Sequence, residues 1–459
     1  MVRLQPDRST MAAVAAVWAT LRDMGLTAKR HRARPTVAAA NVEPAFIDEL
    51  GHAASLLSGS SEPDELPASL GWFGAPIRRQ RRKPPEPPRA ALWASTMDGH
   101  NGDRIRTAHY DSWATVGLPR PVDRLAREDQ EVSLLADGAT LATGAGDRLV
   151  EEAPDLFRTC FERDRDRILH ATAFRRLAGK TQVFVFPEDH QRSRLTHALE
   201  VAQVARAIAG SLGLNVPLTE AIALGHDCGH GPGGHASEDA LSLYVDGGYD
   251  HAQWGADVTL APLNLCRETL DGIRNHSWSR PAPATPEGEV VSWADRIAYV
   301  CHDFEDAVHT GIVDPADLPA VVRERCGTAR REQLSAFIDG VVGPSASRGR
   351  IGMDHDTAAA LGAFRAFDYA RIYLRPASLA QASRVIALLR ALVDHFTTAP
   401  EDLPTDALHG FEDHSGSDAV RLAAVRYVGG MTDRYACRIA TRLLGWNAER
   451  LPAGLDVGS

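Results

Sequence analysis

The chain has 459 residues, of which 44% are hydrophobic and 24% charged, and its formal net charge is −10. This composition is typical of a soluble globular protein that can bury a sizeable core. The acidic excess gives the whole molecule no long-range attraction for nucleic acid or for an acidic membrane surface, so a local cluster must hold any anionic ligand.

The six cysteines are scattered and include no CxxC pair. This argues against a disulfide framework or a structural zinc site, and it favours a reducing compartment in which the thiols are mostly buried. The apolar stretch 11–21 is shorter than the roughly 20 residues that a spanning helix needs, and no suitable cleavage site follows it. We therefore expect a cytoplasmic protein with no membrane segment.

Residues 1–96 are rich in proline, serine and arginine, and we expect this extension to be poorly ordered. Its basic run Arg78–Lys83 could bind single-stranded nucleic acid weakly, although a solvated stretch is the better interpretation. Regular patterning begins after Met97, which is a candidate start of the native protein. Residues 97–154 are then a lead-in segment.

From Asp155 onward, segments of helical length follow one another and strand-like alternation is scarce, which predicts an all-α fold. We expect a main domain over 155–340 and a C-terminal helical region over 353–450 packed on its core, with 341–352 as an exposed linker. The expected helices span residues 194–212, 218–225, 289–309, 357–373, 378–397 and 417–444.

The first of these helices carries a histidine among apolar residues. Its two apolar faces hold Leu195, Leu199, Ala202, Ala205 and Leu212 on one side and Val201, Val204 and Ile208 on the other. Apolar positions on two sides are typical of a central, buried helix. Its single polar intruder, His197, would by itself be a satisfied core histidine more often than a ligand.

Two further helices supply polar groups that a core should not tolerate. The second ends in the adjacent pair His226 and Asp227, where the change in backbone direction can aim both side chains at one point. The third carries a stripe at spacings of three or four residues, made of Asp295, Tyr299, His302 or Asp303, and Asp306. An ordinary solvated face would carry Lys, Glu and Arg instead.

Burying two carboxylates is costly unless a cation neutralises them, and neutral imidazoles cannot do so. His197, His226, Asp227 and Asp295 together offer two nitrogens and two carboxylates. This set fills four positions of an octahedron and leaves two for water and a phosphate oxygen, which suits Mn, Fe, Co or Mg better than a closed zinc site. The pattern predicts a catalytic divalent metal.

With these residues in place, the chain resembles the HD-domain superfamily and specifically the deoxyguanosine triphosphate triphosphohydrolase family. The matching blocks are 164–185, 192–209, 224–238, 287–307 and the C-terminal signature 429–436. The resemblance implies a multi-helix HD-domain fold with additional C-terminal helices, a deoxynucleoside triphosphate substrate, and a homo-oligomer. It also implies the same four metal ligands.

The resemblance also assigns residues around the metal. Arg194 would contact phosphate, and His230 and His235 would face the triphosphate, where the Gly-rich loop 231–234 should leave backbone donors exposed. Tyr299 and Asp303 would contact the sugar, and Gln182 is a weaker candidate for a sugar or base contact.

The catalytic pair implied by the resemblance is Glu238 and His251. Glu238 would orient His251, which would protonate the departing 5′-oxygen as water attacks the α-phosphorus. The segment that carries His251 is one residue shorter than the usual family pattern. The products would be a deoxynucleoside and tripolyphosphate.

Two departures from the family pattern bear on the substrate. Gly231 and Gly233 stand where the family commonly has Pro and an aromatic residue, which predicts a thinner, more mobile pocket wall, and the segment 253–264 is short. Two alternatives stay open at this point: an HD-domain phosphohydrolase acting on another nucleotide phosphate ester, and a non-catalytic binder of nucleotides or single-stranded nucleic acid that uses Arg78–Lys83 and the basic stretch 163–180.

Overall fold

The computed structural model describes residues 89, 93–94, 97–101, 104–113, 115–117, 120–187, 190–405, 407 and 417–454. The predicted disorder of residues 1–96 lies outside the described residues, apart from 89, 93 and 94, and the predicted role of Arg78–Lys83 lies wholly outside them. The chain divides into two units, 1–116 and 117–459.

The described part of the first unit contains one antiparallel pair of short strands, β1 (His100–Asn101) and β2 (Arg106–Thr107). His100 pairs with Thr107, and Asn101 pairs with Arg106. The described part of the second unit is built from helices, which confirms the predicted all-α fold.

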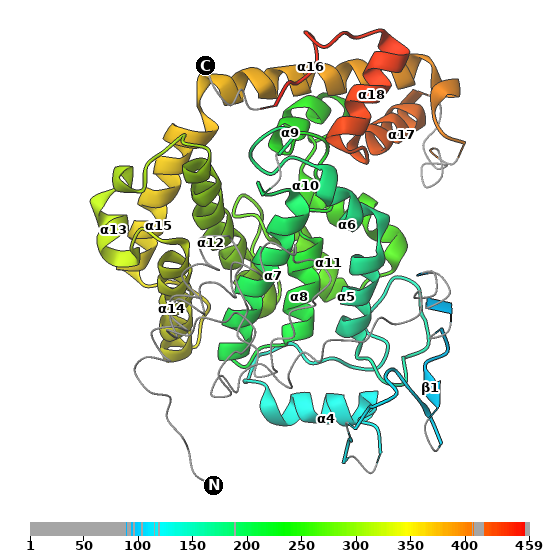
Figure 1. Ribbon diagram of the computed structural model, residues 1–459, viewed down its shortest axis with the longest axis vertical. Coiled ribbons are helices and arrows are strands. Elements are labelled where there is room, and N and C mark those ends of the chain that lie inside the picture. The colour runs from blue at the N-terminus through cyan, green and yellow to red at the C-terminus, as the bar shows by residue number, and fades with distance from the viewer. Residues whose placement is uncertain are drawn as a thin grey trace, which may run out of the picture. The chain divides into compact units, whose positions relative to one another are not determined.

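The helices of the second unit follow one another along the chain (Figure 1), with the longer connections 135–159 and 180–193 before α5 and α7. The α-helices are α4 (Arg124–Leu134), α5 (Cys160–His170), α6 (Thr172–Arg176), α7 (Arg194–Ser211), α8 (Val216–Gly225), α9 (His235–Leu241), α10 (His251–Trp254), α11 (Arg267–Asn275), α12 (Pro286–His309), α13 (Ala320–Cys326), α14 (Arg330–Arg348), α15 (His355–Asp368), α16 (Pro376–Thr398), α17 (Ser417–Gly429) and α18 (Asp433–Leu444). The 3-10 turns are η2 (Leu177–Gly179), η3 (Ser242–Tyr244), η5 (Ala261–Leu263), η6 (Pro315–Asp317) and η8 (Pro400–Asp402), and the π turns are η4 (Gly255–Thr259) and η7 (Tyr369–Tyr373).

The centre of the second unit is formed by α7, α8 and α12, with α5 and α11 packed against α8. In α7, Val201, Val204 and Ile208 are fully buried, as expected for a central helix, whereas Leu199, on the other predicted apolar face, is 48% exposed and leaves that face incomplete. The start of α8 is defined by Asn215, whose side chain accepts a hydrogen bond from the amide of Leu218. These helices place polar side chains at the middle of the core.

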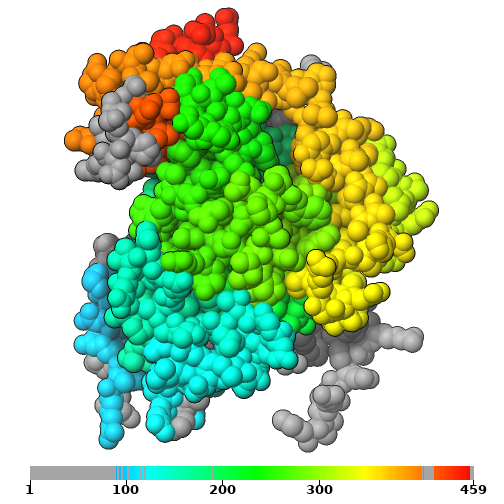
Figure 2. Space-filling view, turned by 180° about the vertical axis from the view of Figure 1, so that it is seen from behind, coloured from blue at the N-terminus to red at the C-terminus, as the bar shows by residue number. Residues whose placement is uncertain are grey.

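The C-terminal helices build a second core with part of the main body. α16 packs against α9, α17 and α18 and runs along the top of Figure 1 above α9, and its Leu388, Leu389 and Leu392 are buried in an apolar cluster that also contains Ala240 and Leu241 of α9. Seen from behind, the segment with α4 covers the opposite end of the central helices (Figure 2). The C-terminal region is therefore in direct contact with the elements that follow the His-Asp pair.

The prediction of an exposed linker over 341–352 is wrong for most of its length, because α14 continues to Arg348. Pro344 lies inside this helix, and the proline cannot donate the hydrogen bond that the carbonyl of Gly340 would normally accept. The amide of Asp354 donates to that carbonyl instead, at 3.1 Å. A contact from beyond the helix thus compensates for the helix-breaking residue.

The single helix predicted over 417–444 is two helices, α17 and α18, with a break at Gly430–Thr432. The break turns the backbone so that the carbonyl of Gly429 accepts a hydrogen bond from Lys180 at 3.0 Å. The other expected helices are confirmed, with residues 369–373 of the expected helix 357–373 forming the π turn η7.

No helix in the described part of the chain combines the length and apolar character needed to cross a membrane. All six cysteines are free thiols and five are buried, with Cys437 at an intermediate position, which confirms the expectation of buried thiols without disulfides.

Glu287 of α12 connects the lead-in segment, residues 97–154, to the central helices through hydrogen bonds. Its buried carboxylate accepts hydrogen bonds from the amide and hydroxyl of Thr140, at 3.0 and 2.7 Å, and from the amide of Asn215, at 3.0 Å. We expect Glu287→Ala to lower the free energy of unfolding by about 3 kcal/mol, because these donors lose a charged acceptor. Urea denaturation measures the change.

The matched control is Glu289→Ala, two residues further along α12, whose side chain makes no hydrogen bond with the described residues. It should change the free energy of unfolding by less than about 0.5 kcal/mol. Equal effects of the two substitutions would contradict the anchoring role of Glu287.

Candidate metal centre

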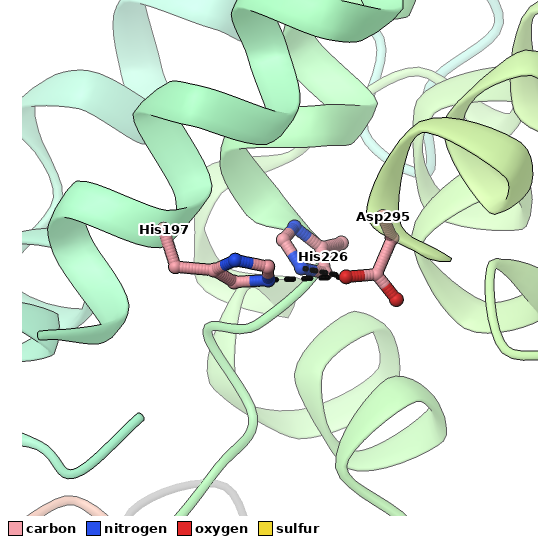
Figure 3. A group of neighbouring side chains, drawn as sticks. All are labelled: His197, His226 and Asp295. Carbon is pink, nitrogen blue, oxygen red and sulfur yellow. Dashed lines mark hydrogen bonds and ion pairs between the residues drawn. The ribbon is translucent and has the colours of Figure 1, made fainter. Parts of the chain in front are cut away.

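The structure brings the four predicted metal ligands together from three helices. His197 comes from α7, His226 and Asp227 follow α8, and Asp295 comes from α12 (Figure 3). His197 Nε2 lies 3.0 Å from Asp295 Oδ1 and 3.9 Å from Asp227 Oδ2. His226 Nε2 lies 3.4 Å from Asp227 Oδ1 and 3.6 Å from Asp295 Oδ1.

The end of α8 is held in place by close packing. A Cβ at Gly225 would lie 2.5 Å from Cδ1 of Ile273, so only glycine lets the end of α8 approach α11 this closely. The imidazole of His226 is then fixed by its Nδ1, which donates to the carbonyl of Ala223 at 2.6 Å. This orientation makes Nε2 the nitrogen that faces the carboxylates, and Nε2 would offer its lone pair to a metal ion bound between them.

The Nε2 atom of His226 has no hydrogen-bond donor within reach among the described residues. Nε2 is buried and lacks a hydrogen-bond partner in the described structure, while carboxylate oxygens of Asp227 and Asp295 lie nearby. Lone pairs on nitrogen and on carboxylate oxygen repel one another unless a cation lies between them. The donor set of nitrogen and oxygen atoms fits a divalent metal ion, and His197, His226 and Asp295 place ligand atoms within 4.8 Å of one another.

The electrostatics of the cluster favour positive charge. Burial would raise the pKa of Asp227, but Arg194, His226 and His230 hold it well below its ordinary value. Burial likewise opposes ionisation of Asp295, and hydrogen bonds from His197 and His226 hold its pKa well below the usual range. Burial lowers the pKa of His226, but Asp227 and Asp295 raise it to about 9, so without a metal Nε2 carries a proton between the carboxylates, and a bound metal ion would take the place of that proton. Both carboxylates are therefore ionised and attract a cation.

Glu238 and His251 form the pair that was expected from the resemblance. His251 Nδ1 makes a very short contact with Glu238 Oε1, and the His251 amide donates to the same oxygen at 3.0 Å. The ring of His251 stacks on that of His230 with centroids 3.7 Å apart, and its Nε2 lies 4.0 Å from Asp227 Oδ1. The pair thus faces the carboxylate of the metal cluster.

His276, at the end of α11, is a site residue that the sequence prediction missed. Its Nδ1 donates to the carbonyl of Ile273 at 2.7 Å, so its Nε2 carries a lone pair, and that Nε2 lies 3.2 Å from Nε2 of His251. A hydrogen bond between the two rings therefore needs a proton on His251 Nε2, while the contact with Glu238 needs one on His251 Nδ1. Both nitrogens of His251 are therefore needed as donors in these two contacts.

Arg194 is the principal cation beside the cluster. It is 1% exposed, and its Nη1 donates to Asp227 Oδ2 at 2.7 Å, whereas Nε and Nη2 have no hydrogen-bond partner among the described residues. His230 is buried 3.3 Å from Asp227 Oδ1, and burial together with Arg194 holds its pKa well below the usual range, so its imidazole is neutral. His235 is exposed at the start of α9.

The expected exposed backbone donors of loop 231–234 are not available. The Gly231 amide donates to Ser237 Oγ, the Gly233 amide to Asp433 Oδ1 and the Gly234 amide to the carbonyl of Gly231, at 2.9, 2.9 and 3.3 Å. Pro232 has no amide hydrogen. Side chains rather than backbone groups must therefore bind an anion here.

Gly231 and Gly233 are closely packed by their neighbours. A Cβ at Gly231 would lie 2.7 Å from Cβ of Ser237, and one at Gly233, where φ is +73°, would lie 2.4 Å from Cγ1 of Val385. Neighbouring side chains therefore occupy the space that the larger residues of the family would need, and the wall next to the loop is not thinned.

Tyr299 and Asp303 lie on one face of α12 and contact residues after it. Tyr373, in the π turn, donates to Asp303 Oδ2 at 2.6 Å, and Arg365 Nε donates to the hydroxyl of Tyr299 at 2.7 Å. Burial raises the pKa of Asp303 to about 7. The Oε1 atom of Gln182 is buried without a hydrogen-bond partner in the described structure, as is Asp303 Oδ1.

A cavity of about 120 Å³ adjoins this face of α12. It is lined by Trp278, Trp293, Arg296, Ala358, Leu361, Gly362 and Arg365. Arg296 stacks over Trp278 at 3.8 Å, and neither Arg296 nor Arg365 forms an ion pair with a carboxylate of the described residues. Sequence reasoning missed both arginines and Tyr373, because their places in the site depend on tertiary packing.

Comparison with known proteins places these features in a family. Residues 194–300 match the HD domain, and residues 351–442 match the phosphohydrolase-associated domain. The chain is 38% identical over 316 residues to a deoxyguanosinetriphosphate triphosphohydrolase-like protein of Caldanaerobacter subterraneus, covering 67% of this chain and 92% of the relative. A protein of the same description from Jannaschia sp. is 36% identical over 366 residues, covering 65% and 92%.

Solved structures show a distant likeness. A phosphohydrolase of Bacteroides thetaiotaomicron is 17% identical with a TM-score of 0.39, over 61% of this chain and 69% of that one. A hypothetical protein of Aquifex aeolicus is 18% identical with a TM-score of 0.36, over 52% and 63%. Neither likeness bears on function.

Removing one carboxylate of the cluster should remove the metal. We expect Asp295→Ala to weaken Mn²⁺ binding by at least about 100-fold, since even the loss of a hydrogen-bond partner of a metal ligand costs roughly 10- to 100-fold. Titration calorimetry of the metal-free protein measures the affinity. Glu305→Gln, which changes a carboxylate on the same helix that pairs with Arg192 and Arg330, should bind Mn²⁺ like the unchanged protein. Tight binding by Asp295→Ala would contradict the site.

Proposed function

Since the chain belongs to the deoxyguanosinetriphosphate triphosphohydrolase-like family of HD-domain proteins, we propose that it hydrolyses deoxynucleoside triphosphates to a deoxynucleoside and tripolyphosphate. The observation that carries this proposal is the convergence of three kinds of group on Asp227. His226, Arg194 and His251 all lie within 4.0 Å of its carboxylate oxygens. A metal site, a phosphate-binding cation and a proton donor thus meet at one place.

The metal site would be formed by His197, His226, Asp227 and Asp295. A bound divalent ion would polarise a phosphate oxygen and make water a stronger nucleophile. Mn, Mg, Co and Fe all accept this mixture of imidazole and carboxylate ligands. The fixed ring orientation of His226 supports the assignment, because its Nε2 already points toward the carboxylates.

The chain's own residues would bind and orient the triphosphate. Arg194 has two nitrogen atoms free of protein partners among the described residues, and a guanidinium binds phosphate oxygens in a fixed planar geometry. His230 and His235 would add neutral hydrogen-bond donors beside it. Arg296 and Arg365 add positive charge next to Tyr299 and the adjoining cavity.

The proton would come from His251. As the oxygen of water bonds to the α-phosphorus, the bond from that phosphorus to the 5′-oxygen breaks, and His251 Nε2 gives its proton to the departing oxygen. Glu238 holds the opposite nitrogen and keeps the imidazolium charged and oriented. Before substrate arrives, His276 would accept the hydrogen bond from Nε2 and hold the ring in this position.

The sugar would lie along α12. Asp303, held by Tyr373, offers an acceptor for a 3′-hydroxyl, and Tyr299, held by Arg365, offers a flat ring beside it. The unpartnered Oε1 of Gln182 is a further acceptor for a sugar or base.

Product analysis tests the reaction. The purified protein is incubated with Mn²⁺ and each deoxynucleoside triphosphate, alone and with the others present as activators, and the products are separated by ion exchange. We expect a deoxynucleoside and intact tripolyphosphate. Release of monophosphate or pyrophosphate, or hydrolysis of cyclic nucleotides or monophosphates alone, would contradict the proposal and favour another phosphate ester.

His276→Phe should slow the chemical step. The phenyl ring keeps the shape of the side chain but cannot accept the hydrogen bond that holds His251 Nε2 in position, so we expect kcat to fall by roughly 10- to 100-fold with a smaller change in KM. Steady-state kinetics on the best substrate measures both constants. Ser277→Ala, which alters only a hydroxyl bonded to Ser279, is the matched control and should leave both constants unchanged. An unaltered kcat in His276→Phe would show that His276 has no part in proton transfer.

A further inference from the structure

The C-terminal signature 429–436 has no role in the chemistry described so far, yet it lies against the loop between His230 and His235. Asp433, at the start of α18, is buried and uses both carboxylate oxygens. Its Oδ2 accepts from the amide and hydroxyl of Thr181 at 2.9 and 2.6 Å, and its Oδ1 accepts from the amide of Gly233 at 2.9 Å. One side chain thus joins the C-terminal helices, the entry segment and the loop.

Lys180 makes a second connection at the other end of the loop. It is 3% exposed, and its ammonium donates to the carbonyl of His230 in a very short contact and to the carbonyl of Gly429 at 3.0 Å. The carbonyl of Lys180 in turn accepts from the amide of Arg194 at 3.2 Å. The same short segment therefore fixes the backbone at His230 and at the start of α7.

The loop has little freedom between these two connections. Gly234 has a φ of +63°, and a Cβ there would lie 2.7 Å from Arg194 Nη2 and 3.0 Å from the Thr181 carbonyl. The loop therefore passes directly over the Arg194 guanidinium. A shift of the loop would move His230 and His235 at its two ends, and Arg194 beneath it, at the same time.

We propose that Asp433, together with Lys180 and Thr181, is a clamp by which the C-terminal helices position the phosphate-binding side chains Arg194, His230 and His235. These three clamp residues touch no substrate and are positioning residues. α17 lies beside α9, which the loop precedes (Figure 1), and α16 packs against both α9 and α18. The identity of the bound anion rests on the proposed function, whereas the clamp itself rests on the contacts above.

The competing explanation is that Asp433 only stabilises the fold. Two measurements distinguish this explanation from the proposed positioning role. The first is amide hydrogen exchange of the metal-loaded protein, read at loop residues 229–235. Asp433→Ala removes the acceptor of the Gly233 amide, so we expect that amide to exchange at least about tenfold faster, while α7 and α12 keep their protection. Unchanged exchange in the loop would overturn the clamp.

The second measurement is binding of inorganic tripolyphosphate to the Mn²⁺-loaded protein. We expect Asp433→Ala to weaken this binding by roughly tenfold or more, with Mn²⁺ affinity unchanged, because Arg194 and the loop histidines are displaced but the metal ligands are not. A matched control is Asp394→Ala, which removes a different C-terminal carboxylate that accepts from Tyr244 in the main domain at 2.7 Å. It should alter neither quantity, and equal weakening by both variants would overturn the positioning role.

Thr181→Val is a milder variant in case Asp433→Ala does not fold. It removes only the hydroxyl that donates to Asp433. We therefore expect faster loop exchange and weaker tripolyphosphate binding, each by a smaller factor than in Asp433→Ala. Unchanged values would overturn the clamp. If the unchanged protein fails to bind tripolyphosphate, the proposed function is wrong, while the exchange measurement still decides whether the clamp exists.

Discussion

Two ionised carboxylates in the middle of a helical core are the constraint on which the rest of this structure depends. Asp227 is 3% exposed, and burying such a group costs several kcal/mol unless positive charge accompanies it. Arg194 supplies one positive charge in direct contact with Asp227. The histidines bring nitrogen lone pairs rather than permanent charge, so the cluster as a whole attracts a metal ion. Buried carboxylates that would otherwise only lower the stability of the fold can therefore bind the metal ion that the proposed reaction needs.

The surrounding helices fix the chemistry by fixing hydrogen-bond directions. Backbone carbonyls at the ends of α8 and α11 each accept from Nδ1 of a histidine, His226 and His276, and so decide which nitrogen faces the centre. Glu238 does the same for His251 from the opposite side. The C-terminal helices then hold the loop above Arg194 through Asp433. Each of these contacts fixes the orientation of a side chain that has a defined role in the proposed reaction.

Much of this arrangement is readable from the sequence because it is local. His197, His226, Asp227 and Asp295 each interrupt an apolar pattern on a helix, and such interruptions predict a shared buried site. His276 gives no such signal, since it follows the amphipathic helix α11 and gains its role only from the packing of that helix beside His251. The helix through Pro344 and the break after Gly429 were mispredicted for the same reason, because long-range hydrogen bonds from Asp354 and Lys180 decide them. The predicted domain boundaries, homo-oligomer and cytoplasmic location stay predictions.

The position of the bound metal ion is the most direct test of the proposed site. Anomalous diffraction from crystals grown with Mn²⁺, recorded on both sides of the manganese absorption edge, locates the ion without reference to any reaction. We expect one strong peak between His197, His226, Asp227 and Asp295, within about 2.0 to 2.3 Å of the ligand atoms. An absence of bound manganese, or a peak that excludes Asp295 or His197, would contradict the account.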